Sequence, residues 1–293
     1  MRLTRPLGLA AVAFVSMLIP EARAEWARDP DHNVLLSTDK TGSAWTPPAL
    51  THDPAGNTFI ALQTIYAHVQ KLDANGNLLW GPKGIPATQT ATSKVGQLAV
   101  SDGQDGVIVA WLNNYYSGGN AYVYAQKLNA AGQPQWGPDG VAVCTAPGIR
   151  YDLVACSVGE GGIYLAWSDR RGGTNSNEDA DDIYAQRVNA TGQVLWMVNG
   201  APVCLTPGKQ NQTQILLSAS GGPLIAWHAI LPVSQDDGKI WVQYLKLDGT
   251  PLWAVDGVRV AITTADQGSP RLGSRRGRSA GRRPRLAVDP PNR

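Results

Sequence analysis

The chain has 293 residues, with 10 Trp, 9 Tyr and 32 Gly but only 2 Phe, and a formal net charge of +2. Residues 271–293 carry eight Arg and one Asp, residues 1–24 carry three Arg and one Glu, and the body between them has a net charge of −7. The acidic body excludes a nucleic-acid partner recruited by overall charge, and the composition favours strands and tight turns over helices.

The N-terminus has the pattern of a secretory signal. Arg2 and Arg5 precede an apolar run over residues 7–19, which is followed by Pro20 and a small-x-small triplet at 22–24. This pattern predicts a signal peptide over 1–24 that is cleaved before Glu25. The run is too short to span a bilayer, and no later segment is apolar enough. We therefore expect a secreted or periplasmic protein without a membrane span.

The body, residues 25–270, consists of a repeated sequence pattern. One Trp family recurs at spacings of 56, 60 and 57, and a second recurs at spacings of 56 and 60. The first family is Trp80, Trp136, Trp196 and Trp253, each inside a G-x-x-x-W-x-x-x-G motif, and the second is Trp111, Trp167 and Trp227. A period near 57 is typical of a propeller or another repeat array. Both families are interpreted as packing residues rather than as an aromatic ligand platform.

Each period contains four short alternating segments separated by Gly- and Asn-containing turns, which predict antiparallel strands. Four strands in about 57 residues is the size of one β-propeller blade. The predicted fold is therefore all-β and propeller-like, with four blades over 47–88, 94–145, 152–205 and 212–262. Trp26 aligns with the fourth strand of a blade, so an N-terminal orphan strand is predicted and the ring is expected to be incomplete.

The repeat resembles known families. The segment "DIYAQRVNATGQVLW", with "GIYLAWSDRRGG" upstream, looks like a repeat of large exported bacterial proteins with a β-propeller-like fold. The segment "KLDANGNLLW" partly resembles the strand motif of quinoprotein-type propellers. The Thr of that motif is present only at Thr191 among the first three copies, and no quinone-binding insertion is found, so no cofactor is predicted.

The last segment, 271–293, departs from the repeat. It is rich in Arg, Gly, Pro and Ser, where a strand ending in "AW" and a third strand are expected. Three interpretations are considered for this segment: a truncated or frameshifted end, a disordered basic tail and a nucleic-acid arm. The stretch 284–290 also resembles the first strand of a blade at 48–54. Because the second and third strands of the blade are missing in each case, a sheet edge stays open at each end of the array, which predicts self-association.

No catalytic constellation or metal site is predicted. The four His residues occupy unrelated repeat positions without metal-ligand spacing. An acidic run at Glu178, Asp179, Asp181 and Asp182 contains oxygen ligands that Ca²⁺ prefers, but a solvated loop is the favoured interpretation. Cys144 and Cys204 are expected to be small packing residues, because other copies have Thr88 and Ala261 at this position. A Cys144–Cys156 disulfide is the alternative.

The variable connections all leave one rim of the array, between the second and third strands of each period. Repeat proteins often bind through such loops. The candidate contacts for a glycan or protein ligand are Tyr115, Tyr116, Arg170, Arg171 and Asp181. The sequence thus favours a non-catalytic binding or scaffold module. The alternative is a fragment of a propeller enzyme, either a quinoprotein-like dehydrogenase or a glycan-active enzyme.

Overall fold

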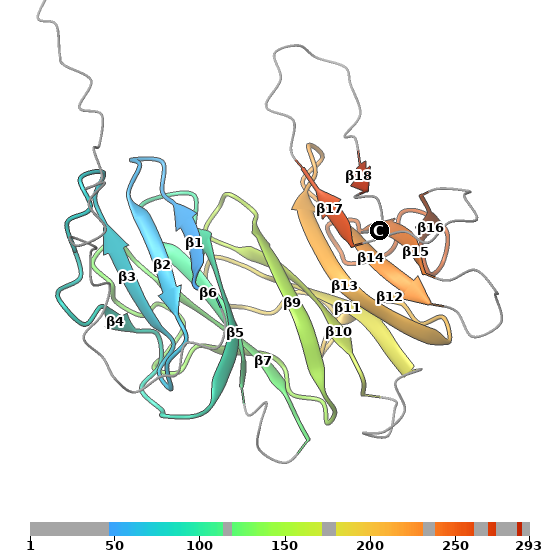
Figure 1. Ribbon diagram of the computed structural model, residues 1–293, viewed down its shortest axis with the longest axis horizontal. Helices are drawn as coiled ribbons and strands as arrows, with labels where there is room; N and C mark the ends of the chain where they lie inside the picture. The colour runs from blue at the N-terminus through green and yellow to red at the C-terminus, as the bar shows by residue number, and fades with distance from the viewer. Residues whose placement is uncertain are drawn as a thin grey trace, which may run out of the picture.

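The computed structural model describes residues 47–113, 119–171, 180–230, 238–260, 269–273 and 286–288. Every regular element in these ranges is a β-strand, so the all-β prediction is confirmed. The strands form antiparallel units of four in chain order, and these units follow one another across the molecule (Figure 1). The signal peptide and the predicted orphan strand at Trp26 lie outside the described residues.

The first unit consists of β1 (Ala49–His52), β2 (Thr58–Leu62), β3 (His68–Leu72) and β4 (Ile85–Pro86), and the second of β5 (Lys94–Ser101), β6 (Val107–Asn113), β7 (Tyr122–Leu128) and β8 (Val141–Cys144). The third consists of β9 (Arg150–Ser157), β10 (Ile163–Asp169), β11 (Ala180–Val188) and β12 (Ala201–Cys204), and the fourth of β13 (Gly208–Leu217), β14 (Pro223–Ile230), β15 (Lys239–Tyr244) and β16 (Val258–Arg259). A short parallel pairing of β11 with β13 joins the third and fourth units into one eight-stranded sheet.

Two further strands follow the fourth unit. β17 (Pro270–Leu272) pairs with β18 (Leu286–Val288) and lies beside β13 and β14. Part of the Arg-rich segment is therefore in a strand and not in an irregular tail. The first strands of successive units are neighbours, from β1 through β5, β9 and β13 to β17 (Figure 1). Within the described residues, the sheets do not close into a ring.

The hydrophobic cores lie between units rather than within them. One cluster combines the second and third units, another the third and fourth, and a third the first and second. A smaller cluster on the far side of the fourth unit contains Leu224, Ala226 and Val242, with Leu272 of β17 packed against it. Each unit therefore depends on its neighbour to remove its apolar face from water.

The first Trp family links consecutive units. The indole Nε1 of Trp80 donates to the carbonyl of Ala130 at 3.2 Å, and that of Trp136 donates to Ala190 at 3.0 Å. Trp196 donates to Leu247 at 2.9 Å, so each acceptor lies in the last turn of the next unit. These three side chains are buried, whereas Trp253 is 41% exposed. The repeat motif therefore encodes a contact between units, which Trp253 lacks among the described residues.

A buried Gln also recurs in every unit. Its side-chain Oε1 accepts the backbone N–H of the repeat Trp, and its Nε2 donates to a carbonyl beyond that Trp. The four residues are Gln70, Gln126, Gln186 and Gln243, all fully buried. The last strand of each unit makes few backbone hydrogen bonds to its neighbour. The side-chain hydrogen bonds of this Gln therefore help to fix the segment around the repeat Trp against the rest of the unit.

Candidate functional site in the third unit

The third unit departs from the repeat by gathering charged residues. At the start of the first strand, the second and fourth units have Lys94 and Gln210, while the third unit has Arg150. At the end of the second strand, Asn113 and Ala229 correspond to Asp169 in the third unit. The second unit thus has a cation at the first of these positions but a neutral residue at the second, and the fourth unit is neutral at both. Only the third unit combines a cation with a carboxylate at these two positions, which marks it as the candidate site.

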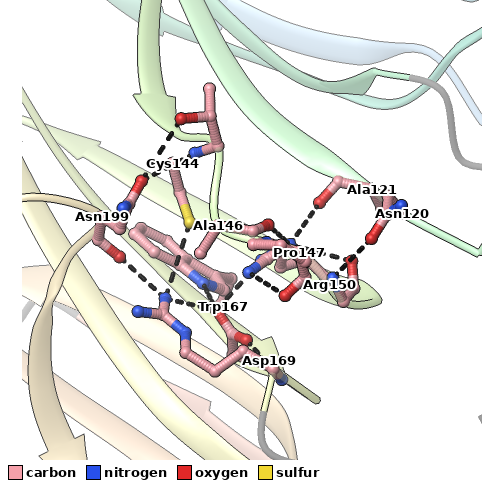
Figure 2. Close-up of polar contacts among 12 residues, drawn as sticks. Asn120, Ala121, Cys144, Ala146, Pro147, Arg150, Trp167, Asp169 and Asn199 are labelled. Atoms are coloured by element: carbon pink, nitrogen blue, oxygen red, sulfur yellow. Dashed lines mark hydrogen bonds and ion pairs between the residues drawn. The ribbon is translucent and has the colours of Figure 1, made fainter.

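Arg150 and Asp169 form the centre of this network (Figure 2). The Nε of Arg150 lies 3.0 Å from Oδ2 of Asp169, and neither side chain is exposed to solvent. Nη1 of Arg150 donates to three loop carbonyls, those of Ala121, Ala146 and Gly148. A buried charge is tolerated only when it is paired and fully hydrogen-bonded, and Arg150 meets both conditions.

Asp169 also collects two further donors. Trp167 of the second Trp family donates its Nε1 proton to Oδ2 at 2.8 Å. Nη2 of Arg171 lies 2.5 Å from the same oxygen and donates to the carbonyl of Asn199 at 2.7 Å. The Arg171 guanidinium lies 3.6 Å from the ring centroid of Tyr184. Arg171, one of the predicted ligand contacts, thus has hydrogen-bond and ring partners within the protein.

A second charged group lies at the hairpin end of β10 and β11. Nε and Nη2 of Arg170 donate to the two carboxylate oxygens of Asp181 at 2.6 and 3.0 Å, a bidentate pair. Tyr151 donates its hydroxyl proton to Oδ2 of Asp181. Burial and this hydrogen bond to Asp181 raise the pKa of Tyr151. Two of the predicted contact residues therefore bind each other.

Asp152 is a charged residue of the first strand of this unit that faces solvent. It occupies a bulge of β9 with φ of 48°, in the left-handed region that non-glycine residues rarely adopt. The equivalent bulge residues are Gly96 (φ 61°) and Gln212 (φ 55°), at the same 56- and 60-residue spacings as the Trp. The bulge is therefore part of the repeat, and the third unit differs from its neighbours in placing a carboxylate on it.

The surroundings of Asp152 favour its protonated form. The carboxylate remains in contact with solvent, but desolvation by the surrounding protein raises its pKa, and the negative charge of Asp181 adds to this effect. The backbone N–H of Gln212 donates to Oδ2 at 2.6 Å and partly opposes the shift. The first strand of the third unit therefore presents an accessible carboxyl group that holds its proton more tightly than a free Asp.

Asp182 provides a test of these electrostatics. Desolvation and the charge of Asp169 raise its pKa from 3.8 to about 6. The folded protein therefore binds this proton more tightly than the unfolded chain does. Below about pH 4 the carboxyl group is protonated in both states, so it does not lower the free energy of unfolding. The penalty develops as the pH rises towards 6 and is complete above it.

We expect Asp182→Asn, which removes this charge, to leave stability at about pH 4 unchanged. At about pH 7.5 the substitution should raise the free energy of unfolding by about 1–2 kcal/mol, after discounting for the partial exposure of the side chain. Urea unfolding of both proteins at the two pH values measures the difference. An equal gain at both pH values would show that titration of Asp182 is not the cause.

The structure brings together three of the five predicted ligand contacts, Arg170, Arg171 and Asp181. Tyr115 and Tyr116 lie outside the described residues. Sequence reasoning missed Arg150, Asp152 and Asp169, although aligning the units at their Trp residues exposes each of them as a departure from its equivalents. Cys144, Cys156 and Cys204 are free thiols.

Two absences apply only to the described ranges. No group of three or more His, Cys, Asp or Glu side chains in them is placed to hold a metal ion. They also include no helix of the length and apolarity needed to cross a membrane. Glu178 and Asp179 of the predicted calcium alternative fall outside these ranges.

No family model matches the chain, and no curated protein sequence matches it. Solved structures do resemble its fold. A thermostable family-43 glycoside hydrolase is 13% identical, with a TM-score of 0.39 over 77% of this chain and 78% of that one. A GH93 α-L-arabinofuranosidase of Fusarium graminearum, in complex with arabinobiose, is 10% identical, with a TM-score of 0.48 over 83% and 73%. A PL25 ulvan lyase is 12% identical, with a TM-score of 0.48 over 69% and 52%.

These comparisons correct one prediction from the sequence. The chain was expected to be a non-catalytic binding or scaffold module, but the structures that resemble it are enzymes acting on glycans. The non-catalytic prediction is not retained, and a glycan-active enzyme remains a proposal that rests on this chain's own residues. At 10–13% identity the likeness concerns the all-β fold and assigns no residue of this chain.

Proposed function

We propose that this chain is an exported glycan-active enzyme, or part of one, with Asp152 as its general acid. The observation that carries the proposal is the accessible Asp152 carboxyl group, raised in pKa and displayed on a left-handed bulge of β9. Glycoside hydrolysis needs a carboxylic acid that keeps its proton until the glycosidic oxygen accepts it.

In the proposed reaction, Asp152 donates its proton to the glycosidic oxygen as the bond from that oxygen to the anomeric carbon breaks. Water supplies the hydroxyl group that the anomeric carbon gains, and its remaining proton returns to Asp152. Asp181 acts as a positioning residue, because Arg170 and Tyr151 fix its carboxylate and its charge helps to raise the pKa of Asp152.

The proposed architecture is a propeller in which each antiparallel unit is one blade. The neighbouring first strands β1, β5, β9 and β13 are then the innermost strands, and the bulge residues of β5, β9 and β13 lie on the inner side of the array. Active sites built where several repeats converge fit this arrangement. Export follows from the signal-peptide pattern over 1–24.

Asp152→Asn tests the proposal. A panel of plant and algal polysaccharides is incubated with the full chain, and new reducing ends are measured. We expect the natural chain to cleave at least one of them and the variant to lose at least about 100-fold in rate, because a positioned general acid contributes at least that much.

Asp248→Asn is the matched control, because Asp248 is an exposed carboxylate in a turn that bonds only within its own turn and should not affect cleavage. A thermal melt verifies that both variants fold, since Asn retains an acceptor for the Gln212 N–H. The proposal fails if the natural chain cleaves none of the polysaccharides, or if Asp152→Asn cleaves as fast as the natural chain.

A further inference from the structure

A partly open cavity with polar and aromatic lining residues lies between the second unit and the connection that leads to it from the first, apart from the charged network of the third unit. Its volume is about 210 Å³, several times the roughly 30 Å³ that one water molecule occupies in the liquid. Its lining includes Thr90, Thr92, Lys94, Trp111, Asn113 and Asp139. The cavity is therefore large enough for a small molecule rather than for a single water.

One donor in this lining has no partner. The side chain of Trp111 is 1% exposed, and its Nε1 proton has no acceptor among the described residues. In the third unit the equivalent indole has an acceptor, because Trp167 donates a hydrogen bond to Oδ2 of Asp169. In the second unit Asn113 occupies the position of Asp169, and its side-chain oxygen accepts a hydrogen bond from Thr92 Oγ1 at 2.5 Å. Among the described residues, the second unit therefore has no counterpart of the oxygen that Asp169 supplies in the third. The same is true of Trp227 in the fourth unit, where Ala229 occupies this position, but Trp111 also lines a cavity.

The charges of the cavity balance without a ligand. Lys94 donates from Nζ to the carbonyls of Ile65 and Thr90 and to Thr92 Oγ1, and burial lowers its pKa to about 8. The Asp139 carboxylate accepts hydrogen bonds from the backbone N–H and the hydroxyl of Thr90, and its negative charge lies near Lys94. One cation and one anion therefore face the same space, which disfavours a charged guest.

From these contacts we infer that the cavity binds a neutral monosaccharide unit, one of whose hydroxyl oxygens accepts the Trp111 Nε1 proton. Hydroxyl groups both donate and accept, so the same guest can bond to the Thr hydroxyls and the Asp139 carboxylate. The Trp111 ring stacks on Tyr124 with centroids 6.2 Å apart, which makes one wall of the cavity rigid and apolar. This site is independent of the proposed cleavage at Asp152.

The decisive variant copies the third unit into the second. In Asn113→Asp, the new carboxylate should accept the Trp111 proton and occupy the place of the sugar oxygen. Saturation-transfer NMR is recorded with glucose, galactose, arabinose and xylose, each at about 20 mM, a concentration that exceeds a weak millimolar Kd. We expect transfer to at least one sugar in the natural chain and none in Asn113→Asp, while the melting temperature stays equal or rises.

Three further measurements separate this site from others. Trp111→Phe removes the unpartnered donor but keeps a ring, so sugar binding should weaken about tenfold. Because Trp111 is buried in the core, the smaller ring should also lower the melting temperature, and binding is compared well below that temperature. Glu160→Ala, at an exposed position of the third unit, should leave sugar binding unchanged. Acetate tests a carboxylate guest instead. Transfer to acetate but to no sugar, absence of transfer to any sugar, or unchanged sugar binding by Asn113→Asp overturns the inference.

Discussion

Replacing Arg150 by alanine should lower the free energy of unfolding by about 3–5 kcal/mol, one of the two largest effects expected in this chain. The substitution removes the partner of a fully buried carboxylate, since Arg150 and Asp169 are both inaccessible to solvent. It also removes the Arg150 donor from the carbonyls of Ala121, Ala146 and Gly148, of which Gly148 still accepts the backbone N–H of Ala121. Each unsatisfied buried group adds to the cost. Urea unfolding followed by Trp fluorescence measures the loss.

The repeat offers a matched variant for this experiment. Arg150→Lys places in the third unit the residue that the second unit has at Lys94, where Nζ bonds to loop carbonyls. It should therefore lose less than Arg150→Ala. Lys246→Ala, at an exposed turn position, should change stability by no more than about 0.5 kcal/mol. A loss for Arg150→Ala no greater than for Lys246→Ala would show that the buried pair does not hold the third unit together.

The sequence is sufficient to predict the all-β fold because its information is local and repeated. Alternating residues set the faces of each strand, and a turn such as 189–192 is fixed by its own side chain, with Asn189 Oδ1 accepting from the N–H groups of Thr191 and Gln193. Gly192 follows with φ of 85°. Local chemistry of this kind is read directly from residue order.

The site was harder to predict because its contacts cross strands and units. Arg170 and Asp181 were predicted as ligand contacts, and their ion pair was not foreseen because it depends on the β10–β11 register, which pairs Asp169 with Asp182. That register sets the next residues of the hairpin, Arg170 and Asp181, facing each other, and they form an ion pair. The role of Asp152 depends on a bulge conformation, which residue order does not encode separately from the strand that contains it.

Trp196→Ala should destabilise the chain by about 3–5 kcal/mol, the usual cost of truncating a buried aromatic. Trp196 is 8% exposed and donates to the carbonyl of Leu247 in the next unit. A Cβ on Gly249 would lie only 2.7 Å from its ring, so the two units are in tight contact there. The substitution therefore opens a cavity between the third and fourth units and removes a bond that joins them.

Trp253→Ala is the matched control, and it should cost no more than about 1 kcal/mol. Its backbone environment is the same, because Gln243 bonds to Trp253 as Gln186 bonds to Trp196. The two Trp residues differ in what covers them. The turn of the next unit covers Trp196, whereas Trp253 is 41% exposed and no such turn covers it within the described residues. Chemical unfolding of the two variants at one low protein concentration compares them. Equal losses would mean that Trp253 is covered in solution, either by another segment of the chain or by a second copy. Repeating the measurement at a tenfold higher concentration distinguishes these two sources, because only a contact between copies strengthens with concentration.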